Sequence, residues 1–167
     1  MSFLSEFFAD RKNRRIVYLA LIFLLALADF LHSGLARRTF IFYSEREGKT
    51  VVEDRMLHRS SLRETDIRRY VDEALLGPMS PGQMPLFPRE TRLNSFMFRD
   101  GVVYADLGES AALPLLGGVN VYLSLLTLNE GIRRNFSFVR DVRLFVGGNE
   151  VFFEEFRGFF ANPADNR

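Results

Sequence analysis

Phe96-Met97-Phe98-Arg99-Asp100-Gly101-Val102-Val103-Tyr104-Ala105-Asp106-Leu107 is the stretch that decides the fold of this 167-residue chain. An Asp-Gly pair between two alternating apolar runs is a strong signal for a β-hairpin with a two-residue turn. Counting outward from the turn pairs Phe98 with Val103 and Phe96 with Ala105, and we expect these four side chains to be buried. Met97 and Tyr104 then share the opposite face of the hairpin.

One helix is predicted on each side of this hairpin. The first has an apolar stripe at i, i+3, i+4, i+7 and i+8, formed by Ile67, Tyr70, Val71, Ala74 and Leu75. Ser61 and Glu64 have the spacing of a capping box at its start, and Gly77-Pro78 ends it. The second helix is predicted from Val119 to about Arg134, with an apolar stripe formed by Val119, Tyr122, Leu123 and Leu126.

Two further pairs of strands complete the predicted domain. One pair lies at 38–44 and 51–57, and the other runs from Val142 to Val146, turns at Gly147-Gly148 and returns through 151–153. The order strand, strand, helix, hairpin, helix, hairpin predicts an α+β fold, with a single mixed or antiparallel sheet and both helices on one face. The Pro-rich segment 78–91 lacks a period and is predicted to be a constrained loop.

The N-terminal part indicates a membrane. A basic cluster at 11–15 precedes Ile16 to Ala28, which contain no charge or amide. Such a run covers about 20 Å as a helix, whereas the hydrocarbon core measures about 30 Å, so a span has to continue to residue 36. The basic flank predicts a cytoplasmic segment at 1–15, a single transmembrane helix at 16–36 and an exported C-terminal part. Two alternatives stay open: cleavage after Ala28 as a signal peptide, and a buried helix of a soluble protein.

Composition excludes several classes of function. The chain has no cysteine, which removes disulfides, thiolate metal sites, cysteine nucleophiles and lipidation of a cysteine. Its arginines alternate with acids along the sequence, so no contiguous basic stretch predicts a nucleic-acid partner. With only two histidines, no metal or cofactor site is expected. His58 lies near Ser60 and Ser61, but no nucleophile elbow surrounds them, and we expect Ser61 to be a helix cap.

The domain resembles the GerMN family, which is named from a sporulation and spore-germination protein. The likeness runs from about Phe40 to Phe153 and rests on the order of five short pieces: Ala74 to Pro78, Leu86 to Pro88, Asp100 to Leu107, Leu126 to Leu128, and Val139 to Gly148. It implies a ring-building-motif-like domain at about 38–155, exported, membrane-tethered and without catalytic residues. This chain has one copy where the namesake resembles a tandem pair, and Gly147 stands where the family often has Asp.

We therefore expect a non-catalytic interaction or assembly module of the cell envelope, in the cytoplasmic membrane with its domain outside. Its expected partners are the membrane and envelope proteins, including a second copy of itself. The alternative is an extracytoplasmic domain that binds a small ligand or glycan. The predicted partner-binding residues are Met84 and Phe87 in the Pro-rich loop, and Phe156 and Phe159 in the C-terminal tail at 156–167.

Overall fold

The computed structural model describes residues 11–32, 34–46, 49–115 and 119–153. Contacts divide the chain into two compact units, Met1–Ala36 and Arg37–Arg167. The first contains helix α2, Arg11–His32, and nine of its large apolar side chains between Ile16 and Leu27 are exposed. Within the described parts of the chain, no helix has the length and apolar character needed to cross a membrane.

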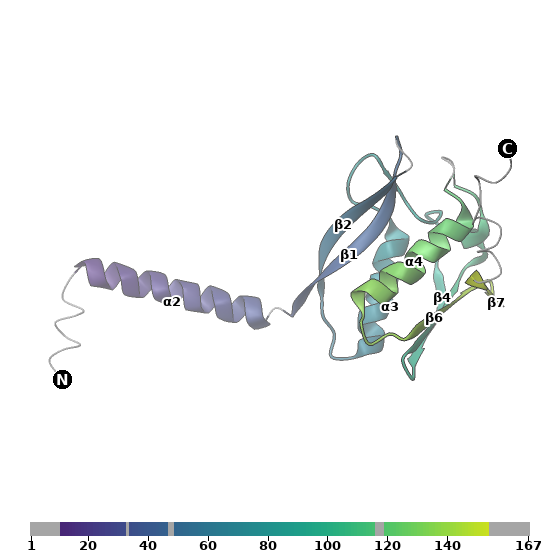
Figure 1. The fold of residues 1–167 in the computed structure, drawn as a ribbon. Coiled ribbons are helices and arrows are strands. Elements are labelled where there is room, and N and C mark those ends of the chain that lie inside the picture. Colours follow the sequence, from purple (N-terminus) through teal and green to yellow (C-terminus); the bar gives the residue numbers. More distant parts are fainter. Residues whose placement is uncertain (1–10, 33, 47–48, 116–118, 154–167) are drawn as a thin grey trace, which may run out of the picture. The chain divides into compact units, whose positions relative to one another are not determined.

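The remaining elements are mixed helices and strands, which confirms the α+β class (Figure 1). In chain order they are β1 Leu35–Ser44, β2 Thr50–His58, α3 Arg63–Leu76, β3 Gln83–Met84, β4 Leu93–Arg99, β5 Val102–Leu107, the 3-10 turn η1 Glu109–Ala112, α4 Val121–Asn135, β6 Asp141–Val146 and β7 Asn149–Glu150. They form two sheets, with the strand orders β2-β1-β3 and β4-β5-β6-β7.

The predicted central hairpin is confirmed in register and in face. Phe98 pairs with Val103, and Phe96 pairs with Ala105. Val103 and Ala105 have no exposed surface, while Phe96 and Phe98 are half-buried and pack against the core. Asp100 and Gly101 both have positive φ, 50° and 78°, as a type I′ turn requires.

The prediction of a single sheet with both helices on one face is wrong. Helices α3 and α4 contact each other, α3 contacts β4, and α4 contacts β6. On their other side Phe40 of β1 stacks on Tyr70 of α3, with ring centres 4.5 Å apart, and Tyr70 contacts Phe136. Each sheet therefore buries its apolar face against the same helix pair, which one continuous sheet cannot do.

The start of α3 differs from the predicted capping box. Leu62 is the N-cap residue, and no side chain accepts a hydrogen bond in the capping position. Glu64 instead accepts a hydrogen bond from the backbone N–H of Phe98 at 3.0 Å, and Asp66 accepts one from Ser60 N–H. A tertiary contact to β4 thus replaces the local contact that the sequence spacing indicated.

Helix α4 buries a different stripe from the predicted one. Its apolar core contacts are Leu125, Leu128 and Ile132, each at most 3 % exposed, whereas the predicted Leu123 is 39 % exposed. The helix carries apolar residues on more than one side, and the parallel pairing of β6 with β5 decides which side faces inward. Asn120 caps its start by accepting a hydrogen bond from Tyr122 N–H at 2.8 Å.

Candidate functional site

The Pro-rich loop does not present the two side chains predicted to bind a partner. Met84 is 9 % exposed and Phe87 is 1 % exposed, so the prediction that they form an accessible binding surface is wrong. Met84 belongs to β3, which pairs with Tyr43 of β1 and thereby turns the loop's apolar side chains inward. Phe156 and Phe159 lie outside the described residues, and their role stays a prediction.

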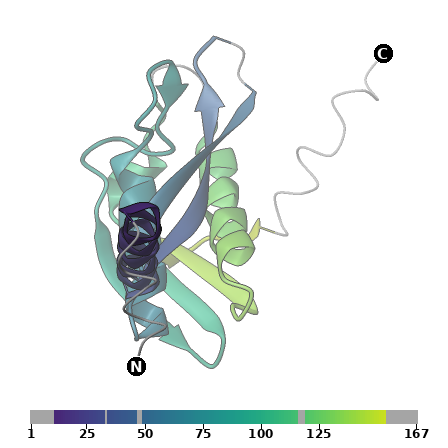
Figure 2. The same ribbon diagram turned by 90° about the vertical axis from the view of Figure 1, so that its left-hand side faces the viewer.

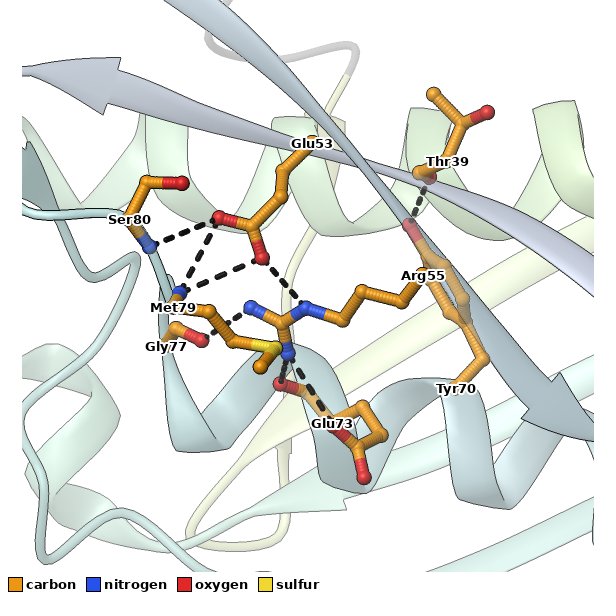
Figure 3. Close-up of polar contacts among 8 residues, drawn as sticks. All are labelled: Thr39, Glu53, Arg55, Tyr70, Glu73, Gly77, Met79 and Ser80. Atoms are coloured by element: carbon orange, nitrogen blue, oxygen red, sulfur yellow. Dashed lines mark hydrogen bonds and ion pairs between the residues drawn. The ribbon is translucent and has the colours of Figure 1, made fainter.

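Arg55 is the centre of a buried polar cluster that sequence reasoning missed (Figure 3). Its side chain is 6 % exposed and bonds Glu53 through Nε at 2.6 Å. The guanidinium also donates to the carboxylate and carbonyl of Glu73, at 3.2 and 3.3 Å, and to the carbonyl of Gly77 at 2.6 Å. Its carbon lies 4.7 Å from the ring centre of Phe40, a cation–π contact.

Glu53 extends this cluster to the start of the Pro-rich loop. Its carboxylate accepts hydrogen bonds from Met79 N–H and from Ser80 N–H, the shortest of each at 3.2 Å. Burial raises the pKa of Glu53, but the hydrogen bonds from Arg55 and Ser80 outweigh it, so that the net pKa is below its usual value. These contacts therefore hold β2, the end of α3 and the start of the Pro-rich loop together.

A period-two signal marked the cluster in the sequence. Val51, Glu53, Arg55 and Leu57 alternate along one strand, so any strand that buries Leu57 also turns the two charged residues inward. Near His58, Ser60 Oγ accepts a hydrogen bond from Leu62 N–H at 3.2 Å, and the backbone carbonyl of His58 accepts one from Arg69.

The strongest candidate surface is the side of the β4-β5-β6-β7 sheet that faces away from the helices; we call it the open sheet face. Met97 on this face is 44 % exposed, and Tyr104 pairs opposite it across the hairpin. A hollow of about 440 Å³ lies here, lined by Ser95, Phe96, Met97, Tyr104, Asp106, Phe145 and Gly148. An aromatic and apolar hollow beside an exposed side chain such as Met97 suits recognition of a partner better than it suits acid–base chemistry.

Two polar contacts hold the open sheet face in shape. Asp106 accepts a hydrogen bond from Gly148 N–H at 2.9 Å, which fixes the β6–β7 turn beside the hollow. The guanidinium of Arg143 lies 5.9 Å from the ring centre of Tyr104. Asp106 therefore supports the β6–β7 turn.

A second, larger hollow of about 760 Å³ lies between α4 and the strands β6 and β7. Its charged walls are partly paired, because Arg143 approaches Asp141 at 3.9 Å and Glu150 at 4.0 Å. Among the residues that the structure describes, no group of three His, Cys, Asp or Glu side chains is placed to hold a metal ion.

Comparison with solved structures identifies the fold. The first GerMN domain of the sporulation protein GerM from Bacillus subtilis matches with a TM-score of 0.51 and 18 % identity, covering 70 % of this chain and 86 % of that domain. The tandem GerMN domains of the same protein match at 0.49 and 17 %, covering 70 % and 41 %. A proposed lipoprotein from Clostridium perfringens matches at 0.45 and 17 %, covering 71 % and 78 %.

No protein-family model and no curated protein matches the sequence. The domain is GerMN-like in fold, as its sequence resemblance indicated. At this level of identity the likeness concerns architecture.

Proposed function

We propose that this protein is a membrane-anchored, extracytoplasmic and non-catalytic interaction module of the cell envelope. The open sheet face is the surface through which we expect it to engage an envelope protein. The observation that carries the proposal is the exposure of Met97 beside the aromatic hollow, on a sheet whose other face packs against the helices.

The proposed anchor rests on the composition of α2. Nine of its large apolar side chains, between Ile16 and Leu27, are exposed. Exposed apolar side chains on all sides of a helix have no stable place in water. The cationic residues Arg14 and Arg15 precede them, which favours a cytoplasmic N-terminus and an exported domain.

The fold supports an extracytoplasmic role in an assembly. The solved domain with the same architecture belongs to a sporulation protein. By analogy of fold, we place this chain in a sporulation-like or other envelope process. Glu53 and Glu73 are paired with Arg55 within the fold, so these two carboxylates are not available as an acid–base pair for a substrate.

Binding of a small ligand or glycan is the second candidate. The Pro-rich loop offers no site for such a ligand at Met84 and Phe87, because both side chains are buried, and the hollow on the open sheet face is the location that we consider. Tyr104 and Phe145 could stack on the apolar face of a sugar there, while Asp106 could accept from a hydroxyl. Saturable binding of a soluble glycan to the hollow, together with the absence of a protein crosslink from this surface, would favour this candidate.

The interaction is tested by placing a photo-crosslinking amino acid at Met97 in the full-length protein in intact cells. The matched control is the same substitution at Met56, which is 50 % exposed on the other sheet. We expect a discrete crosslink to one membrane or exported protein from position 97 only. Equal crosslinks from both positions, or none from position 97, would contradict the proposal.

The topology is tested by fusing a phosphatase after Arg167. We expect the fusion to be active, to sediment with membranes and to resist extraction by alkaline carbonate. An active soluble form that begins at Asp29 would instead support cleavage after Ala28. A fusion that is inactive and cytoplasmic would exclude both alternatives.

A further inference from the structure

Several chain segments begin or end together at one end of the domain, which we call the arginine end. The start of β1, the end of β2, the start of α3, the end of α4 and the β4–β5 turn meet there (Figure 1, Figure 2). Arg38 donates to the carbonyl of Asn135 at 2.8 Å and lies over the Phe136 ring at 4.2 Å. Arg63 lies 4.7 Å from the ring centre of Phe138, which joins this end to α3.

This end carries a surplus of positive charge on its surface. Its exposed arginines include Arg37, Arg59, Arg63, Arg133, Arg134 and Arg140. Against these six stand the four exposed carboxylates of Asp54, Glu64, Asp100 and Glu130, and the exposed Arg99 and Asp141 add one charge of each sign. The sequence did not reveal this cluster, because its members are up to about 100 residues apart and most of them lie near an acid along the chain.

The opposite end of the domain is more balanced. The turn after β1, the Pro-rich loop and the segment after β5 present exposed cations that include Arg46, Arg89 and Arg92. Glu45, Glu90 and Glu109 are exposed on the same segments. The charge is therefore concentrated where the chain enters the domain, and the balanced end supplies a matched control.

We propose that the arginine end docks onto anionic phospholipid headgroups of the membrane that holds α2, an inference that rests on the proposed anchor. Arg37 follows His32, the last residue of α2, by five positions. Five extended residues span at most about 18 Å, so the tether cannot carry this end far from the lipid surface. Phosphate oxygens match the forked donors of arginine, and the attraction extends over about 10 Å at ordinary salt.

Each arginine near an anionic surface strengthens binding about fivefold, equivalent to about 1 kcal/mol. Removing three of them should therefore weaken vesicle binding about 100-fold. High salt should have a similar effect because it screens the attraction. Docking would hold the domain in one orientation on the membrane and leave the open sheet face accessible to a partner.

The test uses the fragment 37–167, because the apolar core cluster of the described residues runs from Phe40 to Leu144 and lies within it. Flotation is measured with vesicles of phosphatidylcholine, with and without phosphatidylglycerol. The triple variant Arg59→Gln, Arg133→Gln and Arg134→Gln is compared with Arg46→Gln, Arg89→Gln and Arg92→Gln. Both variants lose the same charge, and circular dichroism verifies that each is folded.

We expect flotation only with phosphatidylglycerol, a loss of about 100-fold in the arginine-end variant and less than a fivefold loss in the control. Equal losses in both variants would overturn the proposal, as would binding to neutral vesicles or tighter binding to a DNA duplex. Failure of the wild-type fragment to float would also overturn it. The carbonate extraction of the full-length chain tests the anchor separately, so the two failures are distinguishable.

Discussion

Tyr70 and Gly131 fix the distance between α3 and α4, because the Tyr70 hydroxyl occupies the space that a Cβ at position 131 would need. Tyr70 is 2 % exposed, and its hydroxyl donates to the Thr39 carbonyl at 3.2 Å. Burial raises the pKa of Tyr70, so the hydroxyl stays protonated and remains a donor. One side chain therefore joins both helices to the first sheet.

Gly131→Ala is expected to destabilise the domain by about 1 to 3 kcal/mol, because the added methyl group forces apart a packed helix crossing. Urea unfolding of the fragment 37–167 measures this change. Gly108→Ala is the control, since a Cβ there has no neighbour closer than 3.6 Å. The substitution should cost less in a Tyr70→Phe background, and equal costs in both backgrounds would contradict the steric explanation.

Arg55→Met is expected to cost about 3 to 5 kcal/mol, because it leaves the Glu53 and Glu73 carboxylates and the Gly77 carbonyl without their donor. The comparison removes the arginine of an exposed ion pair, Arg68–Asp72. Arg68 approaches Asp72 at 3.9 Å with both side chains more than half exposed, so Arg68→Ala should change the free energy of unfolding by less than about 0.5 kcal/mol. Similar losses in the two variants would show that Arg55 is not the centre of the cluster.

The free energy of unfolding should decrease at acidic pH, because Glu53 becomes protonated there. Its pKa is lowered in the folded protein, so its contribution is complete above the unfolded value of about 4.3 and is lost as the pH falls through the lower folded value. The difference in unfolding free energy between wild type and Glu53→Gln should therefore shrink below about pH 4. A difference that is constant from pH 7 to pH 3 would contradict this assignment. The exposed Asp54 is present in both proteins, so its contribution to the pH dependence cancels in the difference between their unfolding free energies.

Local patterns predicted most of the elements. The Asp100-Gly101 turn fixes its hairpin because only a few residue pairs adopt two consecutive positive φ values. The stripe from Ile67 to Leu75 predicted the buried face of α3 because those residues alone give that helix an apolar side. Both signals lie within one element, where spacing and geometry are directly linked.

Features that depend on tertiary packing were not predicted. The sequence does not specify that β3 closes the first sheet, so neither the second sheet nor the burial of Phe87 could be predicted from it. Leu123 and Leu128 are equally apolar, and only the position of β6 decides which one is buried. The candidate surface was missed for the same reason: Met97 and Phe145 are adjacent only after the parallel β5–β6 pair has formed.

Phe87→Ala should reduce stability and should not act on binding alone. The ring is 1 % exposed in the common core, and truncation of such a residue costs about 3 to 5 kcal/mol. Met97→Lys is the contrasting change, because Met97 is 44 % exposed and its replacement should leave the thermal transition within the range of ordinary surface substitutions. Calorimetry of the fragment distinguishes them, and an unchanged transition for Phe87→Ala would restore the loop as a binding surface.

Leu24→Arg should separate the anchor from the domain. A cation at the centre of a membrane helix costs about 2.5 to 3.5 kcal/mol on insertion scales, and Leu21→Arg in the same chain adds a second charge. The double variant should move the full-length protein from the carbonate-resistant pellet to the supernatant. The thermal transition of the domain should not change, because both leucines belong to the unit Met1–Ala36 while the core cluster lies beyond it. Met56→Arg, an equally drastic change at an exposed site of the domain, should remain in the pellet. If the double variant stays in the pellet as firmly as this control, α2 is not what holds the protein in the membrane.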